Sequence, residues 1–221
     1  MSDQRAAELR GWAGDHGFDF HEDVPESLLD TGFYLFTLGQ DHEVVVGSNL
    51  LTGAWQGMRV RVFDVSFPEV AGVEALGVSG YWIEHDTTTT AMVEVPAELP
   101  YVYVEKKGLL TRAADDLDRV DRLHHDHLEV TCGARDFDTH FEVKTTHREF
   151  AHQLFGHPLM EAILASGTGF VYEVYGERFI VHGPRMRVSE LPTLLDAARR
   201  FRDAIPHEVL GRYATGASDR G

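Results

Sequence analysis

A hairpin pattern constrains the fold of this chain most. Residues 49–65 read Asn-Leu-Leu-Thr-Gly-Ala-Trp, then Gln56-Gly57, then Met-Arg-Val-Arg-Val-Phe-Asp-Val. Two β-prone runs separated by such a pair predict a β-hairpin, because glycine readily adopts the positive φ of a tight turn. Each face of the second arm carries both charged and apolar side chains, which predicts a strand that is covered only in part.

Other patterns in the first half also favour strands. A helix over residues 3–16 is predicted first, since Ala6, Leu9, Trp12 and Ala13 fall on one face. Pro96 and Pro100 are expected to interrupt the ladder, because proline has no amide hydrogen to donate. Strand-like runs occupy residues 33–38, 44–46, 78–84, 88–95 and 101–105.

The character of the chain changes after Gly108. Residues 111–124 predict a charged helix or linker. The later patterns are strands at 128–132 and 141–144, a capping box from Thr146 to Glu149, a helix over 159–165, a hairpin about Gly176-Glu177 and a helix from Ser189. We therefore expect an α+β protein with antiparallel sheets faced by helices. Two similar modules, 1–108 and 109–213, fit this pattern, with 214–221 as a frayed tail.

Composition excludes several classes of partner. The formal net charge is −16, from 20 Lys and Arg against 36 Asp and Glu. Such a surface repels nucleic acid and anionic membranes, so neither is an expected partner. Cys132 is the single cysteine, so no internal disulfide can form. The N-terminus is polar and the apolar runs are short, which predicts a soluble, cytoplasmic protein.

Several residues resemble a known group of proteins. Asn49-Leu50-Leu51-Thr52-Gly53 is followed by Trp55, Gly57 and Phe63, and downstream come Phe137-x-x-x-Phe141-x-Val143, Phe150-Ala151 and Leu154. This pattern resembles uncharacterised actinobacterial proteins of an unknown-function family. The resemblance implies a soluble α+β cytoplasmic protein. It implies no activity and no site residue.

One histidine cluster could bind a metal. On a strand, His125 and His127 would point to one side with Glu129 beside them, whereas on a helix His124 and His127 would be neighbours. Imidazoles with a carboxylate suit zinc, iron or manganese. The alternative interpretation is a polar turn between a charged helix and a strand. A divalent metal is thus a possible cofactor, and no other cofactor is expected.

No catalytic motif is evident in the sequence. Cys132 lacks a signature of a thiol nucleophile and is expected to be an ordinary half-buried cysteine. Gly-rich phosphate loops and Gly-x-Ser-x-Gly are absent from the sequence. We therefore expect a non-catalytic binding or interaction protein. The sequence does not identify its partner, which is either a protein or a small molecule, and it does not determine the oligomeric state. The alternative is a metal-binding protein or metal-dependent enzyme that uses His124, His125 and His127.

Overall fold

A computed structural model of the chain describes residues 2–37, 45–66, 87–107, 127–167 and 169–215. The described residues form an α+β fold with antiparallel strands, as predicted. The chain divides into two compact units, Met1–Thr90 with Gly183–Leu191, and Ala91–His182 with Pro192–Gly221. The expected module boundary at Gly108 lies outside the described residues and stays a prediction.

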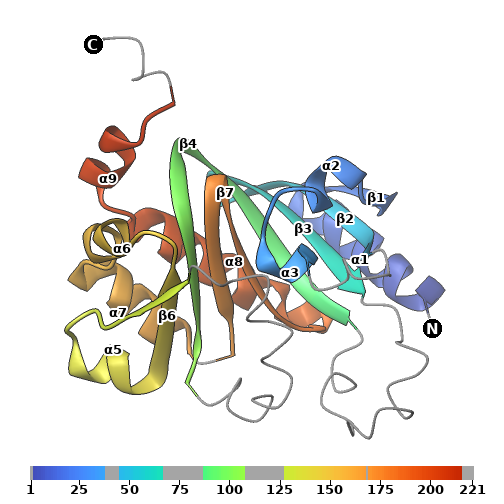
Figure 1. Ribbon diagram of the computed structural model, residues 1–221. Coiled ribbons are helices and arrows are strands. Elements are labelled where there is room, and N and C mark those ends of the chain that lie inside the picture. Colours follow the sequence, from blue (N-terminus) through green and yellow to red (C-terminus); the bar gives the residue numbers. More distant parts are fainter. Residues whose placement is uncertain (1, 38–44, 67–86, 108–126, 168, 216–221) are drawn as a thin grey trace, which may run out of the picture. The chain divides into compact units, whose positions relative to one another are not determined.

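The first unit is a sheet with a helix packed on it. Its strands are hydrogen-bonded in the order β1-β2-β3-β4, and helix α1 contacts β1, β2 and η4 (Figure 1). The elements are α1 (Ser2–His16), β1 (Asp19–Asp23), α2 (Glu26–Leu29), α3 (Tyr34–Thr37), β2 (Val46–Trp55), β3 (Met58–Ser66), the first residues of β4 (Thr87–Lys106) and the short η4 (Val188–Glu190).

The predicted hairpin is confirmed as β2 and β3. Trp55 pairs with Met58, and the two residues between them, Gln56 and Gly57, have φ values of 48° and 81°. Both central residues thus have the positive φ of a type I′ turn, which matches the twist of the strands. Strand β3 is covered more fully than expected. Both of its faces are covered, since four consecutive residues are buried: Val62, Phe63, Asp64 and Val65.

The helix predicted at 3–16 is confirmed as α1. Leu9, Trp12 and Ala13 are buried, and Gly17 follows the helix with a φ of 71°. The chain then passes Phe18, whose ring lies against the backbone of Gly53 in β2. A Cβ added at Gly53 would lie 2.6 Å from Phe18 Cδ1, so this contact requires glycine.

The strand predicted over residues 33–38 is wrong for the residues that the structure describes there. Residues 34–37 form the single helical turn α3 instead. Phe33, Tyr34, Leu35 and Phe36 are all buried. A short, continuously apolar run does not distinguish a buried strand from a buried helical turn, because it has no periodicity of either kind.

The second unit combines a sheet with a group of helices. Strand β7 pairs with β4, and the sheet continues from β4 to β6 and then to β5. In Figure 1, α8 runs behind β7 and β4, in agreement with the ring contacts that Tyr172 and Phe179 make with Phe201. The elements are the rest of β4, β5 (Leu128–Val130), α5 (Arg135–His140), β6 (Phe141–Thr145), α6 (Arg148–Leu154), α7 (His157–Ser166), β7 (Val171–Pro184), α8 (Leu191–Ala204) and α9 (His207–Arg212).

The expected break at the prolines of β4 does not occur. Strand β4 continues through Pro96 and Pro100 to Lys106. Backbone nitrogens point to alternate sides along a strand, so those of Pro96 and Pro100 point to the same side as that of Glu98. On this side, Glu98 N donates to Tyr213 O at an isolated bridge between Ala97 and Ala214. Within the described residues, Ala214 at this bridge belongs to no strand. Proline is therefore tolerated on this side of β4, as it is on an edge strand.

Strand β7 folds back on itself. Glu173 and His182 lie nine positions apart, yet His182 Nε2 is 3.3 Å from Glu173 Oε1. A straight strand would separate these residues by about 30 Å. The chain therefore reverses between them, near Gly176 with its φ of 59°, where the sequence predicts a hairpin.

The second unit contains the helices predicted after residue 146, whereas α5 and α9 were not predicted. The stripe expected for the last long helix is buried in α8, from Leu191 to Phe201, and Ile205 beyond it is buried too. The capping box at Thr146 is wrong: α6 begins at Arg148, and the N-cap is His147, whose Nδ1 accepts from Phe150 N at 3.1 Å. Thr145 Oγ1 accepts from His147 N instead, which holds the preceding turn.

Candidate functional site

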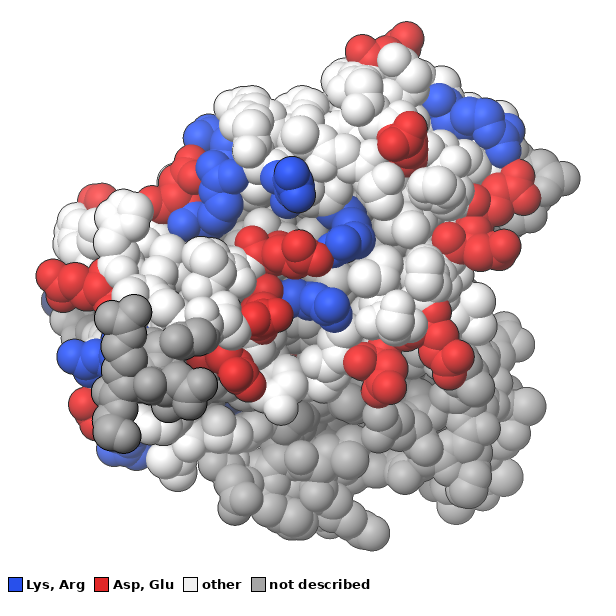
Figure 2. Space-filling model, turned by 90° about the horizontal axis from the view of Figure 1, so that it is seen from above, with Lys and Arg blue, Asp and Glu red and all other residues white. Residues whose placement is uncertain are grey.

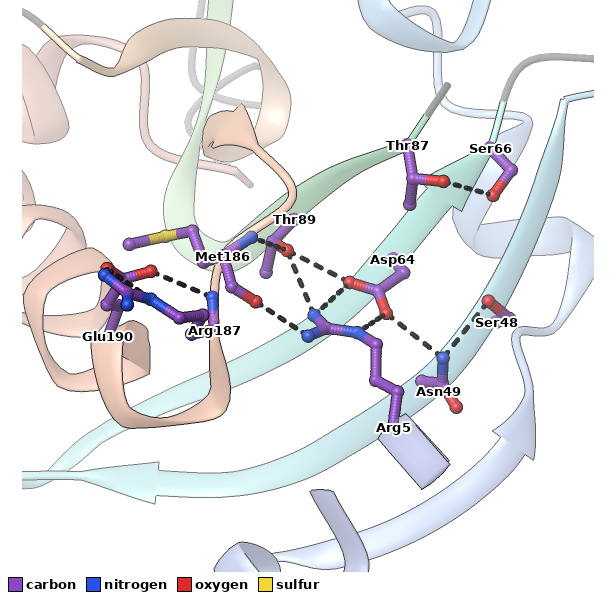
Figure 3. Close-up of polar contacts among 10 residues, drawn as sticks. All are labelled: Arg5, Ser48, Asn49, Asp64, Ser66, Thr87, Thr89, Met186, Arg187 and Glu190. Atoms are coloured by element: carbon purple, nitrogen blue, oxygen red, sulfur yellow. Dashed lines mark hydrogen bonds and ion pairs between the residues drawn. The ribbon is translucent and has the colours of Figure 1, made fainter. Parts of the chain in front are cut away.

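The first unit contains a buried ion pair between α1 and β3. Arg5 Nε donates to Asp64 Oδ2 at 2.5 Å, and Arg5 Nη2 donates to Asp64 Oδ1 at 2.7 Å (Figure 3). The two side chains are 10% and 2% exposed. Arg5 Nη1 also donates to Met186 O at 2.7 Å, so the guanidinium connects three segments of this unit. Two parallel hydrogen bonds of this kind fix the orientation of both groups.

Two further side chains complete the hydrogen bonding of Asp64. Asn49 Nδ2 donates to Oδ2 at 3.1 Å, and Thr89 Oγ1 donates to Oδ1 at 3.0 Å (Figure 3). Asn49 lies at a register shift between Ser48 and Leu51 and has a φ of 58°. Such a bulge re-aims a side chain, and asparagine tolerates this backbone conformation better than most residues. Both oxygens of Asp64 are therefore held by the fold.

The second unit contains a larger polar cluster on its sheet. It comprises Tyr101, Tyr103 and Glu105 on β4, Glu142 and Lys144 on β6, and Glu173 and His182 on β7. We call these seven residues the acidic cluster. Alternation places the three β4 residues on one face, and register places Tyr103 opposite Lys144 and Glu105 opposite Glu142. The intervening Val102 and Val104 are fully buried on the other face.

Hydrogen bonds within the acidic cluster engage its buried carboxylates. Glu173 is 0% exposed; it accepts from Tyr101 Oη at 3.2 Å and lies 3.3 Å from His182 Nε2. Glu105 accepts from Tyr103 Oη at 3.1 Å through Oε2. A buried carboxylate needs such partners because its desolvation is costly. The carboxylates of Glu173 and Glu105 thus each accept a hydrogen bond from a tyrosine hydroxyl.

Glu105 has an unusual proton affinity. Burial raises its pKa from 4.5 to about 7. Lys144 and the hydroxyl of Tyr103 act in the opposite direction, whereas the carboxylates of Glu142 and Glu173 raise the pKa further. Desolvation outweighs the attraction of one lysine, which is expected when the lysine lies at the edge of the cluster rather than in contact.

Two side chains next to the acidic cluster reach the surface. His127 stacks on Tyr101 with ring centroids 4.7 Å apart, and Tyr175 meets the same ring edge-on at 6.2 Å. Tyr175 is 45% exposed, while His127 is half-buried. We call His127 and Tyr175 the aromatic surface. The buried ring of Tyr101 supports it from below.

The histidines predicted to bind metal are placed only in part. His124 and His125 lie outside the described residues. His127 precedes β5 and contacts Tyr101, and Glu129 is exposed on β5. Within the described ranges, no three histidine, cysteine or acidic side chains come together as metal ligands. Binding by the full histidine cluster stays a prediction.

Cys132 is half-buried, as the sequence predicts. Burial raises the pKa of its thiol to about 12, and the carboxylate of Asp138 contributes in the same direction. Asp138 accepts from the backbone amides of Cys132 and Gly133 at 2.8 and 2.9 Å, which holds its charge beside the sulfur. A thiol in these surroundings is a poor nucleophile.

Charges at the surface are mixed rather than segregated. On the face shown in Figure 2, basic and acidic side chains lie next to one another. Exposed ion pairs occur in the second unit, as between Arg199 and Asp203 at 3.1 Å. No helix within the described part of the chain has both the length and the apolar character needed to cross a membrane.

Sequence reasoning missed the acidic cluster and the Arg5–Asp64 pair. Both depend on burial of charged residues that sequence alone places on solvated surfaces. One signal was available: Glu105 ends the strand Tyr101-Val102-Tyr103-Val104, and Glu173 lies between Tyr172 and Val174. A carboxylate inside an apolar, aromatic strand is unusual, because charged residues are rarely fully buried without partners.

Comparison with known proteins yields a similar fold. No protein-family model and no curated protein matches the sequence. Among solved structures, the fold is similar to the crystal structure of the mycobacterial trehalose monomycolate transport factor A, TtfA, with a TM-score of 0.61, 17% identity and coverage of 91% of this chain and 96% of TtfA. At this identity the similarity shows the fold alone. A mycobacterial neighbour agrees with the actinobacterial resemblance, and the family itself stays a prediction.

Proposed function

We propose that this protein is a non-catalytic binding protein that acts as an accessory factor in transport. The observation that carries this proposal is the similarity in fold to TtfA, which extends over nearly the whole of both chains. A glycolipid such as trehalose monomycolate is the first class of ligand to test.

The use of the buried carboxylates supports a binding role. Both oxygens of Asp64 and both oxygens of Glu173 are held by neighbouring side chains. A general base needs a lone pair that can reach a substrate proton. Asp64 is 2% and Glu173 is 0% exposed, so neither carboxylate is placed to reach a substrate proton.

The aromatic surface supplies a candidate contact region. Tyr175 is 45% exposed, and the buried ring of Tyr101 contacts the rings of Tyr175 and His127. Aromatic side chains that are partly exposed and rigidly supported are typical of binding surfaces, because they bury a large area at little entropic cost. We infer that the ligand or partner contacts this surface.

Site-specific photo-crosslinking in cells tests this inference. A photoreactive phenylalanine analogue replaces Tyr175 in one variant and the exposed Glu161 of α7 in a matched control. The expected result is a discrete adduct at position 175 that is missing at position 161, and its mass separates a lipid from a protein partner. Equal labelling at both positions, or none at 175, would contradict the proposed contact region.

A metal-binding role for His124, His125 and His127 is the second candidate. It is favoured by the position of His127, which stacks on Tyr101 beside the buried carboxylate of Glu173. Elemental analysis of the wild type, a His125→Ala/His127→Ala variant and a His157→Ala control tests it. Stoichiometric metal that only the double variant loses would favour this candidate. Equal metal content in all three would remove it.

A further inference from the structure

Two carboxylates in the acidic cluster, those of Glu105 and Glu142, share the ammonium group of Lys144. Lys144 Nζ lies 3.9 Å from Glu105 Oε1 and 3.6 Å from Glu142 Oε1. Both distances exceed that of a hydrogen bond, so the lysine is not committed to either carboxylate. Glu173, on β7, accepts from Tyr101 Oη and lies 3.3 Å from His182 Nε2. The cluster therefore has fewer positive than negative groups.

Glu105 has a buried oxygen without a hydrogen-bond partner. Its side chain is 3% exposed; Oε2 accepts from Tyr103, whereas Oε1 has no hydrogen bond. An ionised carboxylate in this position is costly because one of its oxygens is neither solvated nor hydrogen-bonded. Two changes relieve this cost: a proton binds to the carboxylate, or Lys144 moves inward to it.

We propose that Glu105 is a proton-operated switch whose charge state decides which carboxylate, its own or that of Glu142, holds Lys144. With the proton bound, Glu105 is neutral and Lys144 pairs with Glu142. When the proton leaves to solvent, Glu105 carries a full charge at a more buried position and attracts Lys144 away from Glu142. The two states differ by one proton and one lysine rotamer.

The groups that face Glu105 set the pH of the change. Tyr103 and Lys144 favour its ionised form, whereas Glu142, Glu173 and above all burial favour its neutral form. The resulting pKa of about 7 means that both states are populated near neutral pH. A small change of pH is then enough to shift the population between them.

The switch changes the charge that β6 presents to solvent. Lys144 and Glu142 are 26% and 23% exposed, so both can contact a partner. In the neutral state of Glu105 the two form a pair without net charge. In the ionised state Lys144 turns inward and Glu142 remains unpaired, which adds a negative charge to this face. The switch operates whatever ligand the protein binds.

A pH titration by NMR tests the switch. Carboxyl carbons of Glu105 and Glu142 and the ammonium of Lys144 are followed from pH 5 to 9 in the full chain, with the exposed Glu208 as internal control. We expect Glu105 to titrate near pH 7, and Glu142 and Lys144 to shift with the same midpoint while Glu208 does not. In Lys144→Met the midpoint of Glu105 should rise.

Two outcomes would overturn the switch. One is a Glu105 midpoint near 4.5, and the other is a near-neutral midpoint that the Lys144 and Glu142 signals do not share. In Glu105→Gln, the near-neutral step should vanish from both neighbours. Because the titration of the wild type is decisive alone, the test does not depend on how well this variant folds.

Discussion

Arg5 and Asp64, 59 residues apart, form two parallel hydrogen bonds in the interior of the first unit. Without Arg5, the buried carboxylate of Asp64 keeps the hydrogen bonds from Asn49 and Thr89 but loses its ion pair with the guanidinium. We therefore expect Arg5→Met to lower the free energy of unfolding by about 3–5 kcal/mol. Urea denaturation of the full chain measures this change.

Two variants make this prediction specific. Arg10 pairs with Glu22 at 2.8 Å at the surface, so Arg10→Met should change stability by less than about 1 kcal/mol. The double variant Arg5→Met/Asp64→Leu should recover most of the lost stability, because neither charge remains buried. A single Arg5 variant as stable as the Arg10 variant would show that the pair does not support the fold.

Glu105 should make the stability of the protein fall as pH rises. Its pKa is about 7 in the folded chain against an ordinary 4.5, so between these values the folded state retains a proton that the unfolded state has lost. The penalty is absent below about pH 4.5 and reaches about 3 kcal/mol above pH 7. Urea midpoints at pH 5 and pH 8 measure it.

Glu105→Gln should remove most of this slope and be more stable than the wild type at pH 8. Glutamine keeps the shape and the acceptor for Tyr103 but has no charge to bury. Glu208→Gln, on the exposed face of α9, should leave the slope intact. Equal slopes in the wild type and Glu105→Gln would show that another group is responsible.

Gly53→Ala should destabilise the first unit by roughly 1–3 kcal/mol, because the added methyl group would overlap the ring of Phe18. Gly11 offers a matched control. It lies in the middle of α1, and a Cβ there meets nothing within 4 Å. Gly11→Ala should therefore stabilise the protein by about 1 kcal/mol. If thermal melting gives both variants the same change, the close approach of Phe18 is not required.

Cys132 should react slowly with thiol reagents while the protein is folded. Its pKa of about 12 leaves about one molecule in ten thousand as thiolate at pH 8. We expect alkylation to be at least about a hundredfold slower than in denaturant, where the ordinary pKa is restored. Comparable rates in the two conditions would indicate an accessible, activated thiol.

Several elements could be predicted from the sequence because local signals determine them. The Gln56-Gly57 turn, the helix that opens near Pro158 and the apolar stripe from Leu191 to Phe201 each combine a period with a boundary residue. The run at 33–38 has no period, and its described part is a helical turn. His147 replaced Thr146 as the cap of α6 because Thr145 already holds the amide of His147.

The candidate site was less predictable than the fold. The Arg5–Asp64 pair joins residues far apart in sequence, and no local pattern indicates which acid an arginine will meet. In the acidic cluster, the hairpin in β7 brings His182 to Glu173, and the register of β4 and β6 brings Lys144 to Glu105. Register is a tertiary property, so burial and pKa follow only once it is known.

The proposed binding role is tested most directly by mixing the protein with excess trehalose monomycolate and following complex formation and the fate of the lipid in one sample by mass spectrometry. We predict a saturable complex, weaker in Tyr175→Ala at unchanged melting temperature, with all lipid recovered intact. Multiple turnovers of the lipid into trehalose and free acid would contradict a non-catalytic role. If no complex with the lipid forms and no adduct appears at position 175, binding through the aromatic surface is contradicted.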